Sequence, residues 1–259
     1  MKNDYFGELR ATLRAWPAWY YYALQDIKNK YSRSVIGPLW ITISVAVTIF
    51  AMGPLYKIIF NITGSSYFIH LATGLVFWFW ISGSLADACS AFIGNESFIK
   101  QSKLPLYVYI ARSMLRNLLI LMHNIIIVIF IYLHGGEFSL NVLFVIPGLL
   151  LVTTVLFFSS YVIAFVCARY RDVVPLIGNI LQLFMFLTPI FWIANEATSK
   201  SKYVVYNPFN YLINLLRQPF MGEAIDFSYY HIGILFVFFV FIVTYYVHTK
   251  YSKKVVFWI

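Results

Sequence analysis

The chain has 259 residues, of which 61% are hydrophobic and only 11% charged, and its mean hydropathy is +0.76. A soluble domain of this length needs more charge to stay dissolved, so the composition excludes an ordinary soluble protein and indicates a membrane protein. The formal net charge of +9 does not indicate nucleic-acid binding, because no compact basic domain carries it.

Six long apolar segments follow one another along the chain. They are Val35–Tyr56, Val76–Ala86 within the wider stretch Tyr67–Ile93, Asn117–Gly136, Phe138–Ala168, Val173–Asn195 and Phe227–Thr249. A helix needs roughly 20 mostly apolar residues to cross a bilayer. Five segments meet that length, and the second meets it only if Asp87 and His70 are tolerated within it. The pattern predicts an all-α integral membrane protein with six transmembrane helices.

Lysine and arginine crowd into alternate gaps between these segments, which predicts the orientation. One side carries Lys2, Arg10, Arg14, Lys28, Lys30, Arg33, Lys100, Lys103, Arg112, Arg116, Arg169, Arg171, Lys250, Lys253 and Lys254, and the other only Lys57, Lys200, Lys202 and Arg217. Because cytoplasmic loops are enriched in these residues, both termini are expected in the cytoplasm. The expected organisation is a cytoplasmic amino-terminal segment (1–34), a six-span membrane domain (35–250) and a cytoplasmic tail (251–259).

The amino-terminal segment contains an amphipathic pattern. From Trp16 to Tyr31, apolar and aromatic residues recur at three- or four-residue steps, and Pro17 suits a first helical turn. Aromatic residues beside lysines are typical of a helix lying in the membrane interface. The helix can be a surface anchor, a docking surface for a cytoplasmic partner, or both.

Two cytoplasmic gaps are compact, Gly94–Pro105 and Arg169–Pro175. In the first, Asn95 is a plausible helix cap and Pro105 prevents continuation into the third span. A short basic helix there can receive force from a soluble subunit, although most short loops merely connect.

The gap on the outer side between spans five and six, Glu196 to Asp226, is apolar in its middle. Asn207 reads as a cap, Pro208 as the first helical residue and Pro219 as the end of the helix. About ten residues of helix extend only about 15 Å, too short to cross. The pattern predicts short re-entrant helices that dip into the outer leaflet.

Polar residues inside the spans are few. Asp87 is the one acid. In the third span Arg112 lies at a similar depth and Arg116 one turn deeper, so we expect Asp87 to pair with one of them. The alternative is that all three reach separately to the interface. Asn124 and other polar residues of the spans either line a polar path or join helices, and joining helices is favoured.

Aromatic residues make up 20% of the chain. Many are expected in the interfacial belt or facing lipid. Aromatic faces also suit the apolar faces of sugars, and the candidates for such contacts are Trp40, Phe77, Trp78 and Trp80.

Nothing in the sequence supports catalysis. No Gly-x-x-x-x-Gly-Lys-Ser/Thr loop is present to bind ATP, and no paired acids are present for glycosyl chemistry. No catalytic residue, metal site or cofactor site is predicted.

Several segments together resemble permease subunits of bacterial ABC-type polysaccharide exporters, most of all the O-antigen permeases. The resemblance rests on Asp26–Trp40, Asn95–Pro105, Arg171-Asp172, Pro189–Phe191, and Asn207-Pro208 with Arg217. It implies a homodimer in the bacterial inner membrane that works with two copies of a separate ATPase, which binds ATP and Mg²⁺. The implied cargo is a polysaccharide linked to undecaprenyl diphosphate, passing through a pore lined by spans one, two and five.

The resemblance also implies residue roles. ATPase contacts would come from Asn95, Glu96, Lys100, Lys103, Arg169, Arg171 and Asp172, and the outer gate from Asn207, Pro208 and Arg217. Lys28, Lys30 and Arg33 are candidates for attracting the anionic headgroup, or they anchor the topology. The alternatives are a permease for capsule, teichoic acid or another cargo, and a membrane enzyme of polyprenyl-glycan assembly, which the scarcity of acids in the outer loop disfavours.

Overall fold

The computed structural model describes residues 5–32, 34–37, 39–62, 64, 66–102, 104–135, 139–194, 196–222 and 224–259, with backbone only at 196 and 197. Every regular element within these ranges is a helix. The chain is therefore an all-α protein with the long apolar helices of an integral membrane protein, as the sequence predicts.

Five helices are long and apolar enough to cross a bilayer within the described ranges: α3 (Leu39–Ile59), α4 (Tyr67–Ser90), α6 (Tyr107–Gly135), α7 (Val145–Arg169) and α12 (Ser228–Tyr251). The remaining α-helices are α1 (Tyr5–Arg14), α2 (Trp16–Lys30), α5 (Glu96–Gln101), α8 (Val173–Leu187), α9 (Glu196–Ser199), α10 (Lys202–Val205) and α11 (Pro208–Arg217). Short 3₁₀ segments are η1 (Ile93–Asn95), η2 (Leu140–Phe144), η3 (Gln218–Phe220) and η4 (Ser252–Phe257).

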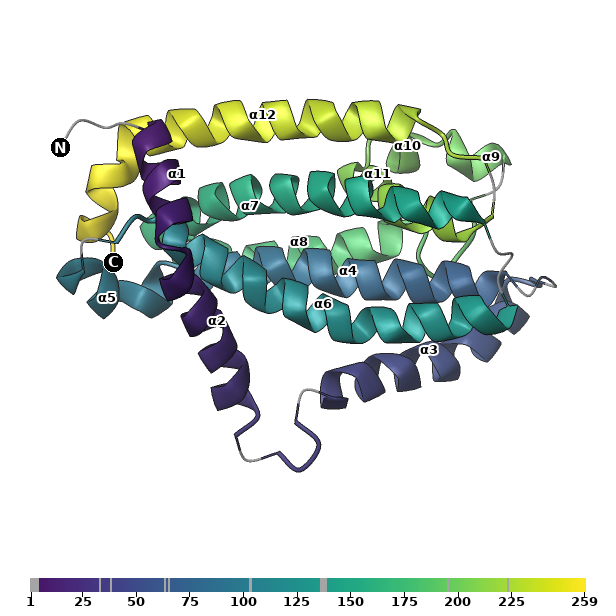
Figure 1. The fold of residues 1–259 in the computed structure, drawn as a ribbon. Coiled ribbons are helices and arrows are strands. Elements are labelled where there is room, and N and C mark those ends of the chain that lie inside the picture. The colour runs from purple at the N-terminus through teal and green to yellow at the C-terminus, as the bar shows by residue number, and fades with distance from the viewer. Residues whose placement is uncertain are drawn as a thin grey trace.

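The long helices run side by side, with α3 and α12 on opposite flanks (Figure 1). In the apolar window of α4, 78% of the residues are buried, against 17% in α3 and in α12. Helix α4 is therefore the centre of the bundle, and α3 is attached loosely. Both marked termini lie at one end of the bundle, which we call the terminal end; α9, α10 and α11 lie at the other, the distal end (Figure 1).

The fifth apolar segment departs from the prediction. Its helix, α8, has 15 residues and ends at Leu187, short of the roughly 20 needed to cross. Thr188 is extended (φ −85°, ψ 138°) because Pro189 follows it and disfavours helical backbone in the preceding residue. The segment from Thr188 to Ala194 continues without a helix, and a count of six spans stays a prediction.

Helix α6, which corresponds to the predicted third span, begins before the uncharged segment Asn117–Gly136. Helix α6 starts at Tyr107 rather than at Asn117, so Arg112 and Arg116 lie within its first half. The helix tolerates both arginines because each has an acidic partner.

The amino-terminal helix is present where predicted. Helix α2 begins at Trp16 with Pro17 in its first turn and packs against α6. Of the predicted apolar stripe, Ala23 is fully buried, whereas Trp16 and Tyr20 stay exposed. Helix α1, which precedes it, was not predicted.

The two predicted caps have different outcomes. The Asn207 side chain accepts a hydrogen bond from the Phe209 amide at 3.0 Å, which confirms the cap of α11. Asn95 occupies the position before α5, but its side chain makes no capping bond. That prediction is wrong, because the Asn95 carboxamide is used by an arginine of α6, described below.

Candidate functional site

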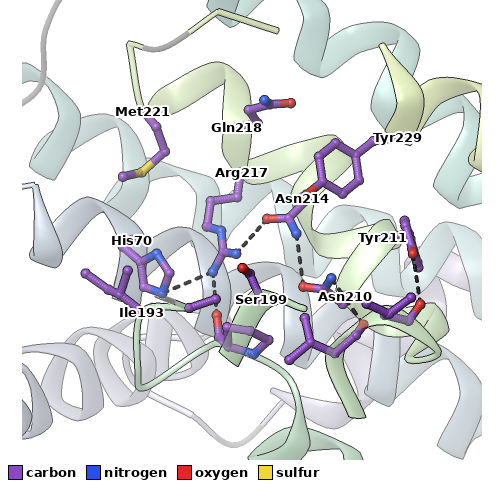
Figure 2. Close-up of a pocket in the computed structure, with 14 residues that line it drawn as sticks. His70, Ile193, Ser199, Asn210, Tyr211, Asn214, Arg217, Gln218, Met221 and Tyr229 are labelled. Atoms are coloured by element: carbon purple, nitrogen blue, oxygen red, sulfur yellow. Dashed lines mark hydrogen bonds between the residues drawn. The ribbon is translucent and has the colours of Figure 1, made fainter. Parts of the chain in front are cut away.

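A polar cavity of about 420 Å³ lies at the distal end, between α11, the start of α4 and the non-helical stretch after α8. Figure 2 shows His70, Asn210, Asn214, Arg217 and Tyr229 around it. The segment predicted to gate the outer side therefore forms a polar recess, with side chains from three separate parts of the chain.

Arg217 is the central group of this cavity and is only 6% exposed. Its Nη1 donates to the Pro189 carbonyl at 2.5 Å and lies 3.1 Å from His70 Nε2, while Nη2 donates to Asn214 Oδ1 at 2.6 Å (Figure 2). A guanidinium has only donors, so the His70 nitrogen can form this hydrogen bond only as an acceptor. The same nitrogen lies 3.2 Å from the Trp192 carbonyl, which needs it as a donor, so the tautomer of His70 decides which of the two hydrogen bonds forms.

The carbonyls freed where α8 ends find partners from other elements. Pro189 O accepts from Arg217, and Phe191 O accepts from the Tyr67 hydroxyl at 2.7 Å. Within apolar surroundings an unpaired carbonyl costs several kcal/mol, so non-helical backbone requires such donors. The distal cluster thus stabilises the break in the fifth segment.

Asn207, at the start of α11, also contacts the stretch that follows α8. Besides capping α11, its Nδ2 donates to Thr188 Oγ1 at 2.8 Å. Pro208 lies in the first turn of α11. A backbone N–H at that position has no acceptor within the helix, so the N–H that proline lacks is not missed there. The three outer-gate candidates, Asn207, Pro208 and Arg217, therefore all position α11 against the broken span; their gating role stays a prediction.

A network of ionic groups lies nearer the terminal end. Asp26 of α2 faces Arg112 of α6, with Arg112 Nε 2.8 Å from Oδ2 and Nη2 2.5 Å from Oδ1. This is the two-pronged arrangement that arginine makes with carboxylates. Arg116 Nη1 adds a longer contact of 3.3 Å to Asp26.

Asp87 completes the network from α4. Of the two arginines considered as partners, Arg116 lies closer: its Nη2 is 2.7 Å from Asp87 Oδ2, and Asn117 Nδ2 donates to the same oxygen at 2.9 Å. Arg112 is engaged by Asp26 instead. Two arginines and two acids are thus balanced, which makes the charges tolerable at this depth.

The network extends to Asn95, one of the predicted ATPase-contact residues. Arg112 Nη1 donates to Asn95 Oδ1 at 2.9 Å, and Asn95 Nδ2 donates back to the Ala91 carbonyl. One arginine therefore contacts both α2 and the segment that leads into α5. Asn95, at the end of η1, is thereby bonded to α6 and, through Arg112, connected to α2.

The other ATPase-contact candidates lie on the same end. Lys100 pairs with Glu96 at 2.7 Å, which lowers the pKa of the Glu96 carboxyl, and its ammonium also donates to the Ile259 carbonyl. Arg169 lies 5.3 Å from the Trp258 ring centre, close enough for a cation–π contact. Arg171 and Asp172 are exposed, and Lys103 lies outside the described residues.

The headgroup candidates Lys28 and Lys30 occupy the last turn of α2, and both are exposed. Arg33 lies outside the described residues. The two described lysines therefore remain accessible for an anionic group, and their role stays a prediction.

The four aromatic candidates are placed differently from one another. Phe77 and Trp78 are buried within the bundle and contact Phe220 and Phe209, so in this structure their rings face protein rather than a path for sugars. Trp40 is 52% exposed on α3, and Trp80, although buried, lines a second cavity.

Sequence reasoning missed two acids. Asp26 lies inside the segment that carries the family resemblance but was not recognised as a partner of α6. Glu8 of α1 accepts from the Leu106 amide at 2.8 Å and pairs with His248 at 3.0 Å, which anchors α1 to α6 and α12. The Asp26 position within an amphipathic helix is a signal that could have been used; nothing local marks Glu8.

No family model matches the chain. Two O-antigen export system permease proteins RfbA of Klebsiella pneumoniae are each 26% identical over 216 residues, covering 82% of this chain and 83% and 82% of the relatives. An RfbA of Myxococcus xanthus with the same description is 19% identical over 188 residues, 71% of this chain and 72% of the relative.

The chain resembles O-antigen export permeases. The resemblance predicted from the sequence is thereby confirmed, and it extends along most of the chain rather than over one motif. The segments that carry the resemblance include Asp26 and Asn95 of the ion network, and Pro189, Asn207 and Arg217 of the distal cluster.

Replacing Arg217 by methionine should destabilise the protein markedly. Methionine keeps the bulk but leaves the Pro189 carbonyl without a donor, a loss of about 2–3 kcal/mol for a buried charge-assisted bond. The measurement is the thermal unfolding midpoint in mild detergent. The control is Arg171→Met, an exposed arginine. Equal shifts in both variants would contradict the role of Arg217.

Replacing Asp26 by asparagine should loosen α2 from α6. The carboxylate and Arg112 are both less than a third exposed, so their coupling in a double-mutant cycle with Arg112→Gln should reach about 1–3 kcal/mol. Unfolding midpoints of the two single variants and the double variant give that coupling. The exposed Glu96–Lys100 pair serves as the control and should show no measurable coupling; similar values for both pairs would refute the prediction.

Proposed function

We propose that this chain is the transmembrane subunit of an ATP-driven exporter that moves an undecaprenyl diphosphate-linked polysaccharide, of the O-antigen type, from the inner to the outer face of the cytoplasmic membrane. The observation that carries the proposal is the similarity to O-antigen export permeases over four fifths of the chain, 82%. The all-helical apolar bundle is the architecture that such a permease requires.

The orientation follows from the distribution of charge. Lys28 and Lys30 lie in the last turn of α2, Lys100 in that of α5 and Arg169 in that of α7. Helix α5 and the last turn of α7 lie at the terminal end, and the last turn of α2 lies nearer to it than to the distal end (Figure 1). Cytoplasmic ends of membrane proteins are enriched in such residues. We therefore propose that the terminal end, with both termini, is cytoplasmic and that α9, α10 and α11 lie on the outer side.

The energy source is proposed to be a separate ATPase. The sequence has no phosphate-binding glycine-rich loop of its own. The segments around Asn95–Pro105 and Arg169–Pro175 would contact that subunit. The hydrogen bond between Asn95 and Arg112 supports the idea, because it gives a force on α5 a direct route to α6 and α2.

The pore is proposed to form between two copies of the chain. Helix α3 supports this arrangement, because only 17% of its apolar window is buried within one copy. Lipid would cover such a helix equally well, so the dimer rests mainly on the family resemblance.

Affinity purification in mild detergent tests the proposal. We expect the tagged chain to retain a distinct ATPase in equal copy number, and the reconstituted pair to hydrolyse ATP and translocate the lipid-linked glycan. Deleting the chain should leave that glycan on the inner leaflet. Glycan polymerisation or transfer by the isolated chain would instead establish a membrane enzyme and overturn the proposal.

Reversing Lys28, Lys30 and Arg33 to glutamate should abolish export. A dianionic headgroup in the inner leaflet is attracted by cations at that level and repelled by acids. The control reverses Lys250, Lys253 and Lys254, which lie at the same end on the tail of α12 and should leave export intact. Export is measured by surface labelling of the glycan, with a carboxyl-terminal reporter confirming insertion. Normal export by a correctly inserted triple variant would exclude the steering role.

A further inference from the structure

Arg217 carries a positive charge to the distal cavity without an acidic partner among the described residues. Its hydrogen bonds go to the Pro189 carbonyl, the His70 imidazole and the Asn214 carboxamide, none of which is negatively charged. The ion pairs of the described carboxylates all involve other cations. Uncharged partners offset only part of the cost of burying a charge, so the burial of this guanidinium is incompletely compensated.

Two other arginines inside the bundle are compensated in full. Arg112 pairs with Asp26, and Arg116 pairs with Asp87. Both of these arginines are partly exposed, whereas Arg217 is buried. The most deeply buried of the three therefore lacks the carboxylate that the other two have, and an anion from outside the chain would supply the missing charge.

The guanidinium of Arg217 has a donor left for such an anion. A guanidinium has five N–H groups, and the three described hydrogen bonds use only those of Nη1 and one of Nη2. Nε takes part in none of them, and it is not among the fully enclosed polar atoms of the described residues that lack a partner. It therefore retains contact with the cavity that Arg217 lines, and this cavity opens to the surroundings beside the exposed Ser199.

A second donor lines the same cavity. The Tyr229 hydroxyl forms no hydrogen bond with the part of the chain that the structure describes, whereas the hydroxyl of Tyr211, another lining residue, donates to the Val205 carbonyl at 2.8 Å. Figure 2 shows Tyr229 next to Asn214 and Arg217. A guanidinium N–H and a hydroxyl both donate to the oxygens of an anion.

The segment around the cavity is positively charged. Of the four lysines and arginines predicted on the outer side, three belong to it: Lys200, Lys202 and Arg217. Both lysines are exposed. The Asp226 carboxylate instead accepts from the Ser228 amide at 2.9 Å, at the start of α12. Such a cluster of cations attracts anions and favours those with more than one charge.

We infer that the distal cavity binds a phosphate group, held by Arg217 Nε and the Tyr229 hydroxyl and attracted by Lys200 and Lys202. Phosphate suits the site because it carries up to two charges and its oxygens accept from donors on different sides. The cavity of about 420 Å³ is many times the roughly 30 Å³ of a water molecule, so a phosphate with attached waters fits. The inference rests on the proposed function only where the phosphate belongs to the exported lipid rather than to a free ion.

Binding to the purified protein in mild detergent, with its ATPase where that is retained and without ATP, tests the inference. Pyrophosphate, measured by isothermal titration calorimetry, represents a free phosphate ion. Undecaprenyl diphosphate, measured by native mass spectrometry against uncharged undecaprenol, represents a lipid headgroup. We expect saturable binding of pyrophosphate, or binding of the diphosphate lipid at least tenfold tighter than that of undecaprenol. Binding of the lipid alone identifies a headgroup as the source.

Two variants and a control locate the site. Tyr229→Phe removes a donor without a described partner, so the affinity should fall about fivefold while the thermal unfolding midpoint stays unchanged. Arg217→Lys should lower the affinity at least tenfold, but it also disturbs the hydrogen bonds of α11, so Tyr229→Phe decides. Tyr206→Phe removes an exposed hydroxyl that does not line the cavity and should bind normally. Lys28 and Lys30 are unchanged throughout, so the affinity lost reports the distal cavity.

Three outcomes would overturn the inference. The first is the absence of binding by pyrophosphate together with equal affinities for the two lipids. The second is an unchanged affinity in Tyr229→Phe, which would place the bound phosphate elsewhere. The third concerns Glu196 and Glu223, whose side chains lie outside the described residues: phosphate binding that appears only in Glu196→Gln or Glu223→Gln would identify a carboxylate of the chain as the partner of Arg217.

The proposed function fails by a different result. Phosphate binding that depends on Tyr229, in a chain that retains no ATPase and exports no glycan, would refute that function and leave this inference standing.

Discussion

Beyond Leu187 the fifth apolar segment is no longer a helix, so its carbonyls need hydrogen-bond donors other than those of a continuing helix. The Ile190 amide supplies one within the segment, to the Thr188 carbonyl, and other carbonyls depend on donors from elsewhere in the protein. Hydrocarbon offers none, so non-helical backbone at membrane depth depends on protein groups brought to it. Arg217 and Tyr67 supply hydrogen bonds to the Pro189 and Phe191 carbonyls, and Asn207 reaches Thr188. Helix α11, the start of α4 and the non-helical stretch after α8 are therefore one hydrogen-bonded unit.

That unit explains why a charged residue can be buried at the distal end. Arg217 is the last helical residue of α11. Its guanidinium contacts the Pro189 carbonyl, the His70 imidazole and the Asn214 amide oxygen. Each contact removes part of the cost of burial. Any movement of α11 away from Pro189 has to break these hydrogen bonds.

Nearer the terminal end, arginines are paired with carboxylates, whereas Arg217 at the distal end contacts only neutral groups in the hydrogen bonds described. Asp26, Arg112, Arg116 and Asp87 alternate in sign and connect α2, α6 and α4. Because Arg112 also reaches Asn95, the loop proposed to meet the ATPase is bonded to the same network. Helix α2, which carries Lys28 and Lys30, and the segment leading into α5 are thus joined by one network of hydrogen bonds and ion pairs.

The sequence by itself determined the helical class, the long apolar segments, the helix that begins at Trp16 and the cap at Asn207. Hydropathy, periodicity and proline predict these features because they act within one turn or one helix. It also carried the family resemblance. Only the tertiary structure decided that Arg112 forms its ion pair with Asp26, whereas Arg116 forms its shorter one with Asp87. It also decided that Phe77 and Trp78 are buried in the core and that Arg217 donates to the Pro189 carbonyl. These outcomes depend on how helices distant in the sequence rotate and slide against each other, and no local pattern encodes that rotation.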